Sequence, residues 1–93
     1  MIKVNEYYEG GVKSLGFENA EGTTTVGVMD AGEFEFGTST DEYMTVTSGE
    51  LSVMLPGETS WKTYKAFDTF FVGKDQKFKV KANEPAAYKC IYK

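Results

Sequence analysis

Apolar residues recur at every second position over much of this chain, and this periodicity constrains its fold more than any other feature. Phe34 and Phe36, for example, alternate with Glu33 and Glu35. The same alternation recurs in four further segments, over residues 44–47, 51–55, 77–81 and 88–93. A period of two is typical of a β-strand with one buried face, whereas an amphipathic helix repeats about every 3.6 residues. Each segment therefore predicts a strand whose apolar side chains face inward.

Turn signals rich in glycine, asparagine and aspartate separate these segments. They fall at residues 9–11, 19–22, 30–32, 48–50, 56–58 and 73–76. Short strands separated by turns at this spacing are typical of sandwiches and barrels, which protect their strand edges by closing or by stacking two sheets. We therefore expect an all-β fold, a barrel or a two-sheet jelly roll. A chain of 93 residues cannot fill a second core, so residues 1–93 are expected to form a single domain.

The chain contains no histidine, and all ten of its basic residues are lysines. A serine–histidine–aspartate triad, a histidine-ligated metal, an imidazole proton shuttle and a guanidinium clamp on phosphate are therefore excluded. The formal net charge of -4 argues against a nucleic-acid polymer as partner. Any chemistry must use lysine, carboxylates, hydroxyls and main-chain amides.

The expected location is the cytoplasm, with no membrane association. No apolar run approaches the length of a membrane span, and residues 1–6 lack the apolar stretch of a signal peptide. The single cysteine, Cys90, cannot form an internal disulfide, which fits a reducing compartment. Cys90 lies on an apolar strand face, so inert packing is the favoured interpretation of this thiol.

Aromatic residues make up 15% of the chain, so large side chains are expected to line the interior. Most aromatic residues on inward faces serve only as core. Tyr88 and Tyr92 lie on the predicted inward face of the last strand. Because a buried hydroxyl needs a hydrogen-bond partner, these two tyrosines predict a pocket that is not wholly apolar.

Motifs along nearly the whole chain resemble those of the small bacterial pyrimidine/purine nucleoside phosphorylases. They include Asn5-Glu6-Tyr7-Tyr8 near the start and Leu55-Pro56-Gly57 in the second half. The other matching positions are residues 10, 12–17, 26–29, 32–36, 42–46, 48–51, 61, 71–72 and 88–92. The resemblance implies a cupin-like β-barrel, that is, a double-stranded jelly roll. It also implies phosphorolysis of uridine, cytidine, thymidine, adenosine, guanosine, inosine and xanthosine to the free base and D-ribose 1-phosphate, with phosphate as co-substrate and no cofactor.

The usual cupin metal ligands are replaced in this chain. Aligned on Gly49 and Asp68, the four ligand positions fall on Phe36, Thr38, Glu42 and Phe78. One carboxylate and one hydroxyl are too few for a transition metal, which takes three or four protein ligands. We therefore expect no metal, and an aromatic pocket with one acid in its place.

Such a pocket suits a nucleoside. Phe36 and Phe78 would flank a flat base without reading its edge, and Thr38, Tyr8 and Tyr88 are further candidates for substrate binding. Glu42 is the candidate catalytic residue, because its carboxylate would accept hydrogen bonds from the ribose diol and favour the positive charge that develops on the sugar. Tyr8, Tyr88 and Asp68 are alternative donors to the leaving base.

The candidate phosphate ligands are Lys13 and Ser14, just beyond the glycine turn, followed by Thr38 and Thr45. Thr38 has an alternative role in closing a turn. Lysines 74, 77, 79 and 81 are interpreted as one solvated strand face.

A competing hypothesis is a metal-free cupin that binds a small ligand, or only dimerises, without catalysis, because fold alone does not fix function. Formation of product separates the two hypotheses. A metal-dependent cupin enzyme is disfavoured by the missing histidines. A small barrel without disulfides has limited core, so a homodimer is expected.

Overall fold

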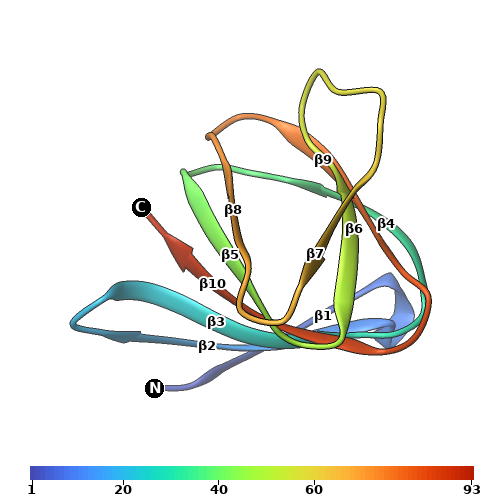
Figure 1. Cartoon of the computed structure of the whole chain (residues 1–93). Helices are drawn as coiled ribbons and strands as arrows, with labels where there is room; N and C mark the ends of the chain where they lie inside the picture. Colours follow the sequence, from blue (N-terminus) through green and yellow to red (C-terminus); the bar gives the residue numbers. More distant parts are fainter.

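Ten β-strands and one short 3₁₀ helix make up the computed structural model, which describes residues 1–93 (Figure 1). The elements are β1 (Lys3–Tyr7), η1 (Tyr8–Gly10), β2 (Val12–Asn19), β3 (Gly22–Met29), β4 (Gly32–Gly37), β5 (Glu42–Ser48), β6 (Glu50–Met54), β7 (Lys62–Lys65), β8 (Thr69–Val72), β9 (Lys77–Ala82) and β10 (Ala86–Tyr92). The all-β prediction is confirmed. The structure contains no helix with the length and apolar character of a bilayer span.

The strands form two antiparallel sheets that face one another. The larger sheet has six strands in the order β1-β2-β3-β10-β5-β8, and the smaller has four in the order β4-β9-β6-β7. No hydrogen-bonded ladder joins the two sheets, so the fold is a two-sheet jelly roll rather than a fully closed barrel. β10, the last strand, lies in the middle of the larger sheet between β3 and β5.

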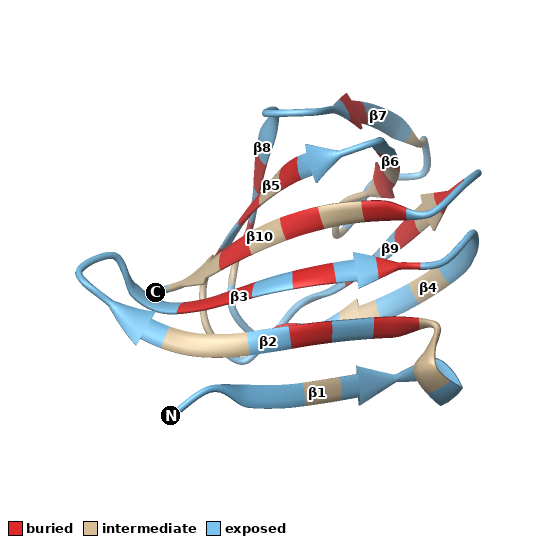
Figure 2. Cartoon of the chain, turned by 90° about the horizontal axis from the view of Figure 1, so that it is seen from below, coloured by how far each residue is buried: buried red, intermediate tan, exposed pale blue.

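The core lies between the sheets and follows the period of two in the sequence. Along β9 and β10, buried residues recur at every second position, separated by exposed or half-buried ones (Figure 2). Val46 of the larger sheet and Leu51, Val53 and Val80 of the smaller one are completely buried. The inward faces predicted from alternation in these strands are therefore confirmed.

The turn at residues 48–50 shows why glycine is needed between two of these strands. Gly49 joins β5 to β6 with φ +77, a conformation that L side chains rarely adopt. A Cβ at this position would also lie 3.2 Å from the Cβ of Ala86. The glycine therefore lets the chain reverse and pass from one sheet to the other at a tight point.

The larger sheet extends beyond the smaller one at its β1 edge. Every residue of β1 is exposed except Asn5, which is half-buried (Figure 2). Register places Lys3, Asn5 and Tyr7 opposite Gly16, Ser14 and Val12 of β2, respectively. Since Ser14 and Val12 are buried, these three β1 side chains share the concave inner face of the sheet.

Candidate active site

A cavity of about 510 Å³ opens on the concave face of the larger sheet, next to β4 and β9 of the smaller one. Its lining residues are Tyr7, Tyr8, Ser14, Met29, Glu35, Phe36, Gly37, Ser39, Glu42, Met44, Phe78, Tyr88 and Tyr92. The structure thus brings together six residues that the sequence proposed separately, namely Tyr8, Ser14, Phe36, Glu42, Phe78 and Tyr88.

One wall of this cavity is aromatic. Phe36 of β4 pairs in register with Phe78 of β9, and their ring centroids are 5.8 Å apart. Tyr8 stands edge-on to Phe36 at 6.0 Å. The Tyr8 hydroxyl donates to the Glu35 carbonyl and accepts from the Glu35 amide, which holds the ring against β4. This wall therefore offers flat apolar surface. The Tyr8 hydroxyl already has two hydrogen-bond partners in the Glu35 backbone.

Glu42 supplies the only carboxyl group in the cavity that is buried. It begins β5 on the inner face, is 9% exposed and lies in register with Tyr92 of β10. Neither ion pair of the structure involves Glu42. Burial raises the pKa of the Glu42 carboxyl above its ordinary 4.5, and a hydrogen bond from Cys90 partly opposes that rise.

The hydrogen-bond partner of Glu42 is a thiol. The Cys90 Sγ–H group donates to Glu42 Oε1 over 3.5 Å, and Cys90 is completely buried. Burial, followed by the charge of Glu42, raises the pKa of Cys90. Because the thiol keeps its proton, Cys90 serves as a packed donor to Glu42 rather than as a nucleophile.

Tyr88 lies over a glycine on the next strand. Register places Ser14, Gly27 and Tyr88 side by side on β2, β3 and β10. A Cβ at Gly27 would lie only 2.5 Å from Tyr88 Cζ, so the absence of a side chain makes room for the ring. Burial is the main cause that raises the pKa of Tyr88 to about 12, and the hydroxyl therefore stays protonated at neutral pH.

Comparison with known proteins identifies the family. Residues 2–92 match the family model described as Pyrimidine/purine nucleoside phosphorylase. The chain belongs to the pyrimidine/purine nucleoside phosphorylase family. A relative of that name from Shewanella halifaxensis (strain HAW-EB4) is 52% identical over 92 residues, which cover 99% of each chain.

Solved structures share the fold of this chain. The crystal structure of a Vibrio parahaemolyticus protein of unknown function has a TM-score of 0.96 and 43% identity, covering 100% of this chain and 99% of that one. An RmlC-like cupin from Shewanella frigidimarina has a TM-score of 0.75 and 22% identity, covering 96% of this chain and 80% of that one. The predicted cupin-like fold is confirmed.

In this family member, three of the four cupin ligand positions line the cavity, namely Phe36, Glu42 and Phe78. The fourth, Thr38, is buried next to it and serves a turn. Its Oγ1 donates to the Gly73 carbonyl over 2.6 Å and accepts from the Gln76 amide over 3.0 Å. The structure thus favours the turn-closing alternative for Thr38 over substrate binding.

Besides Thr38, two other candidate phosphate ligands do not line the cavity. Lys13 is exposed on the outer face of β2, where its Nζ lies 3.5 Å from Glu6 Oε1. The Thr45 hydroxyl, on the outer face of β5, bonds that of Thr69 over 2.7 Å. Only Ser14 faces the cavity, and its Oγ accepts a hydrogen bond from Asn5 Nδ2 over 3.3 Å.

Asp68, a candidate donor to the leaving base, also lies outside the cavity. Its Oδ2 accepts from the Lys65 amide over 2.9 Å and stabilises the turn between β7 and β8. Two further tyrosines line the cavity, of which sequence reasoning predicted Tyr92 as a pocket residue and did not predict Tyr7. Alternation had placed Tyr92 on the inward face, but nothing in the sequence gave the facing of Tyr7, because β1 carries no regular apolar alternation.

Proposed function

We propose that this chain catalyses the phosphorolysis of nucleosides, releasing a free base and D-ribose 1-phosphate. The observation that carries the proposal is the buried, unpaired carboxyl of Glu42 at an aromatic-walled cavity, in a chain of a family whose relatives carry the name of this activity. A carboxyl group left without a cation in a cavity is costly for stability alone, which favours a role in binding or catalysis.

The cavity accommodates a base and a sugar in distinct places. The base lies against the half-buried ring of Phe36, beside the buried ring of Phe78, and an aromatic face stacks on any heterocycle. The ribose lies beside Glu42, which accepts hydrogen bonds from its hydroxyls. Since the aromatic wall makes no hydrogen bonds to the edge of the base, we expect both purine and pyrimidine nucleosides as substrates. Among them are uridine, cytidine, thymidine, adenosine, guanosine, inosine and xanthosine.

The reaction is a displacement at the anomeric carbon. An oxygen of HPO₄²⁻ forms a bond to C1′ as the C1′–N bond breaks, and the electron pair of that bond leaves with the base. The proton that phosphate loses on becoming an ester is balanced by the proton that the base gains. In its ionised form, Glu42 stabilises the positive charge on the ribose ring in the transition state, and no cofactor is needed.

Tyr88 is the proposed hydrogen-bond donor to the departing base. It lines the cavity, and its pKa of about 12 keeps the hydroxyl protonated. Tyr8 is less suited, because the Glu35 backbone occupies its hydroxyl. Asp68 does not line the cavity, which further supports the proposal for Tyr88.

The test is release of base from uridine and adenosine with and without phosphate. We expect base and ribose 1-phosphate only when phosphate is present, and a loss of about 10²–10³-fold in kcat in Glu42→Gln. Glu33→Gln, on the exposed face of β4, is the matched control and should retain full activity.

Three results would contradict the proposal. Base release without phosphate would indicate hydrolysis. Nucleoside binding without product would support the non-catalytic alternative. Activity that is lost with chelator and restored by iron or manganese would indicate a metal-dependent enzyme.

We further propose a homodimer, because the core is small and no disulfide is present. Light scattering on the purified chain measures its molar mass in solution and thus its oligomeric state.

A further inference from the structure

We propose that inorganic phosphate binds beside Lys3, in a second cavity that adjoins the nucleoside cavity. The inference rests on the proposed function, because it names where the second substrate of that reaction lies. It replaces the outer-face residues Lys13 and Thr45 with residues of β1, β2 and β3 on the concave face.

The second cavity has a volume of about 550 Å³. It is lined by Met1, Lys3, Asn5, Tyr7, Gly16, Phe17, Glu18, Thr23, Thr25 and Tyr92. Tyr7 and Tyr92 also line the first cavity, so the two spaces meet at these rings. A ligand in one cavity can therefore approach a ligand in the other across this shared border.

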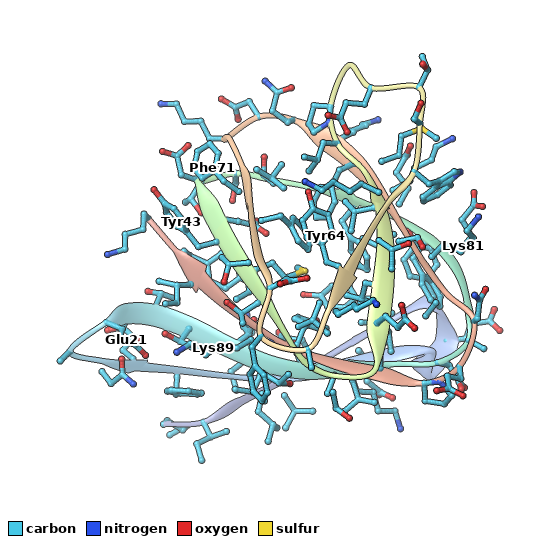
Figure 3. All side chains as sticks on the ribbon, in the orientation of Figure 1. Glu21, Tyr43, Tyr64, Phe71, Lys81 and Lys89 are labelled. Carbon is cyan, nitrogen blue, oxygen red and sulfur yellow. The ribbon has the colours of Figure 1, made fainter.

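Charge singles out Lys3 among the ten basic residues of the chain, all of them lysines. Lys3 is the only lysine that lines either cavity. Lys13 and Lys89 lie on the outer face of the larger sheet and pair with Glu6 and Glu21 (Figure 3 for Lys89 and Glu21). A phosphate dianion bound on the concave face thus has one cationic side chain available.

Three of the remaining lysines lie on β9 of the smaller sheet. On β9, Lys77, Lys79 and Lys81 alternate with the buried Phe78 and Val80, so they face away from the core. The Lys81 Nζ lies 4.4 Å from the centre of the Trp61 ring, at the periphery of the molecule (Figure 3). None of these groups faces the space between the sheets.

The Lys3 ammonium has no carboxylate within 4.0 Å, since both ion pairs of the structure involve other lysines. Register places Lys3, Gly16 and Thr25 in one row across β1, β2 and β3. Gly16, between them, carries no side chain, and a Cβ there would lie 3.7 Å from both Asn5 Nδ2 and Thr25 Cγ2. The Asn5 amide and the Thr23 hydroxyl add uncharged donors, which together suit a tetrahedral oxyanion. Glu18 lines the same cavity and is exposed.

The placement also fits the direction of the reaction. Thr25 Oγ1 and the Tyr92 hydroxyl are 3.0 Å apart, and Tyr92 is in register with Glu42 on the next strand. The base lies at the aromatic end, the ribose at the border formed by Tyr7 and Tyr92, and phosphate on the Lys3 side. Phosphate thus approaches C1′ from the side opposite the departing base, as a displacement requires.

Steady-state kinetics test this assignment. We expect Lys3→Gln to raise the KM for phosphate about tenfold or more, because a charge-assisted contact is lost, with little change in the KM for uridine. Lys89→Gln removes one charge from the outer face and should leave both constants unchanged. An equal rise in Lys13→Gln, or an unchanged KM for phosphate in Lys3→Gln, would overturn the assignment.

Binding of inorganic phosphate alone separates this inference from the proposed function. In ¹⁵N-labelled protein without nucleoside, phosphate should shift the amide signals of Lys3, Gly16 and Thr25, and these shifts should be lost in Lys3→Gln. If the shifts occur but no base is ever released, the phosphate site beside Lys3 is supported and the proposed reaction is contradicted. If phosphate-dependent release occurs but these amides do not respond, the reaction stands and the Lys3 site fails.

Discussion

The two ends of the space between the sheets differ in chemistry, although the same alternating pattern builds both. At one end, Leu51, Val53 and Val80 are completely buried, and the rings of Tyr64 and Phe70 pack with centroids 4.8 Å apart. At the other end, inward positions hold a carboxyl and several hydroxyls around an open cavity. Alternation thus decides which positions face inward, while residue type decides whether they form core or site.

The packed end allows the open end to hold groups that reduce stability. A buried carboxyl without a cation and an unfilled cavity both lower the free energy of unfolding. Aliphatic packing between β6, β9 and the larger sheet offsets these costs. Functional sites in small domains commonly violate the rules of stable packing in this way, and the difference between the ends yields four predictions.

The largest effect on stability is expected at the packed end. Leu51→Ala removes a completely buried side chain and should lower the free energy of unfolding by about 3 kcal/mol, from lost burial and the cavity left behind. Urea denaturation measures the change. The folded fraction should keep the kcat of the parent chain, and a cost below about 1 kcal/mol would show that this end is loosely packed.

Gly27→Ala tests whether Gly27 fixes the position of the Tyr88 ring in the cavity. Its new Cβ would lie 2.5 Å from Tyr88 Cζ, so the ring must move, at a cost of about 2 kcal/mol and with a higher KM for nucleoside. Gly73→Ala is the control, because its Cβ would meet nothing closer than 3.9 Å. Equal stability and equal KM in the two variants would show that Tyr88 has no fixed position.

Thr38→Val tests whether the Thr38 hydroxyl closes a turn or binds the substrate. It removes the hydroxyl that bonds Gly73 and Gln76 and should lower the free energy of unfolding by about 1 kcal/mol. The KM for nucleoside should stay unchanged, because Thr38 does not line the cavity. A raised KM with unchanged stability would restore its role as a substrate ligand.

The smallest effect is a pH dependence of stability. Because burial raises the pKa of Glu42 above 4.5, the folded chain holds this proton where the unfolded chain has released it. The resulting stabilisation is present below pH 4.5 and is lost as the pH rises through the raised pKa. Melting temperatures of the parent chain and Glu42→Gln should therefore diverge with rising pH in favour of the variant. A difference that is constant or reversed would show that the carboxyl is well solvated.

Much of the fold and the aromatic wall could be predicted from sequence, because alternation in β4, β9 and β10 is regular. It correctly placed Phe36, Phe78 and Tyr88 on inward faces. The facing of β1 could not be predicted, since Lys3–Tyr7 has no apolar alternation and one step of register moves a lysine to the other face. The position of Lys13 just beyond the glycine turn predicts a phosphate ligand, but Lys13 lies on the outer face of β2, whereas Lys3 lines a cavity on the concave face.

Long-range contacts account for the other differences. The partners of Thr38 lie 35 and 38 residues further along the chain, so local sequence could not reveal that they occupy its hydroxyl. Tyr8 lies in η1 rather than in a strand, with φ +53. This conformation places its ring in the aromatic wall of the cavity. Such contacts depend on which turns meet in space, and a single sequence does not report that.

The most direct test of the account is a crystal structure of the chain soaked with uridine and phosphate. The base should lie against Phe36 and Phe78, with the ribose hydroxyls within hydrogen-bond distance of Glu42 in the cavity between β5, β9 and β10. Uridine bound only on the outer face of the larger sheet, or a cavity filled by its own side chains with no nucleoside density, would contradict it.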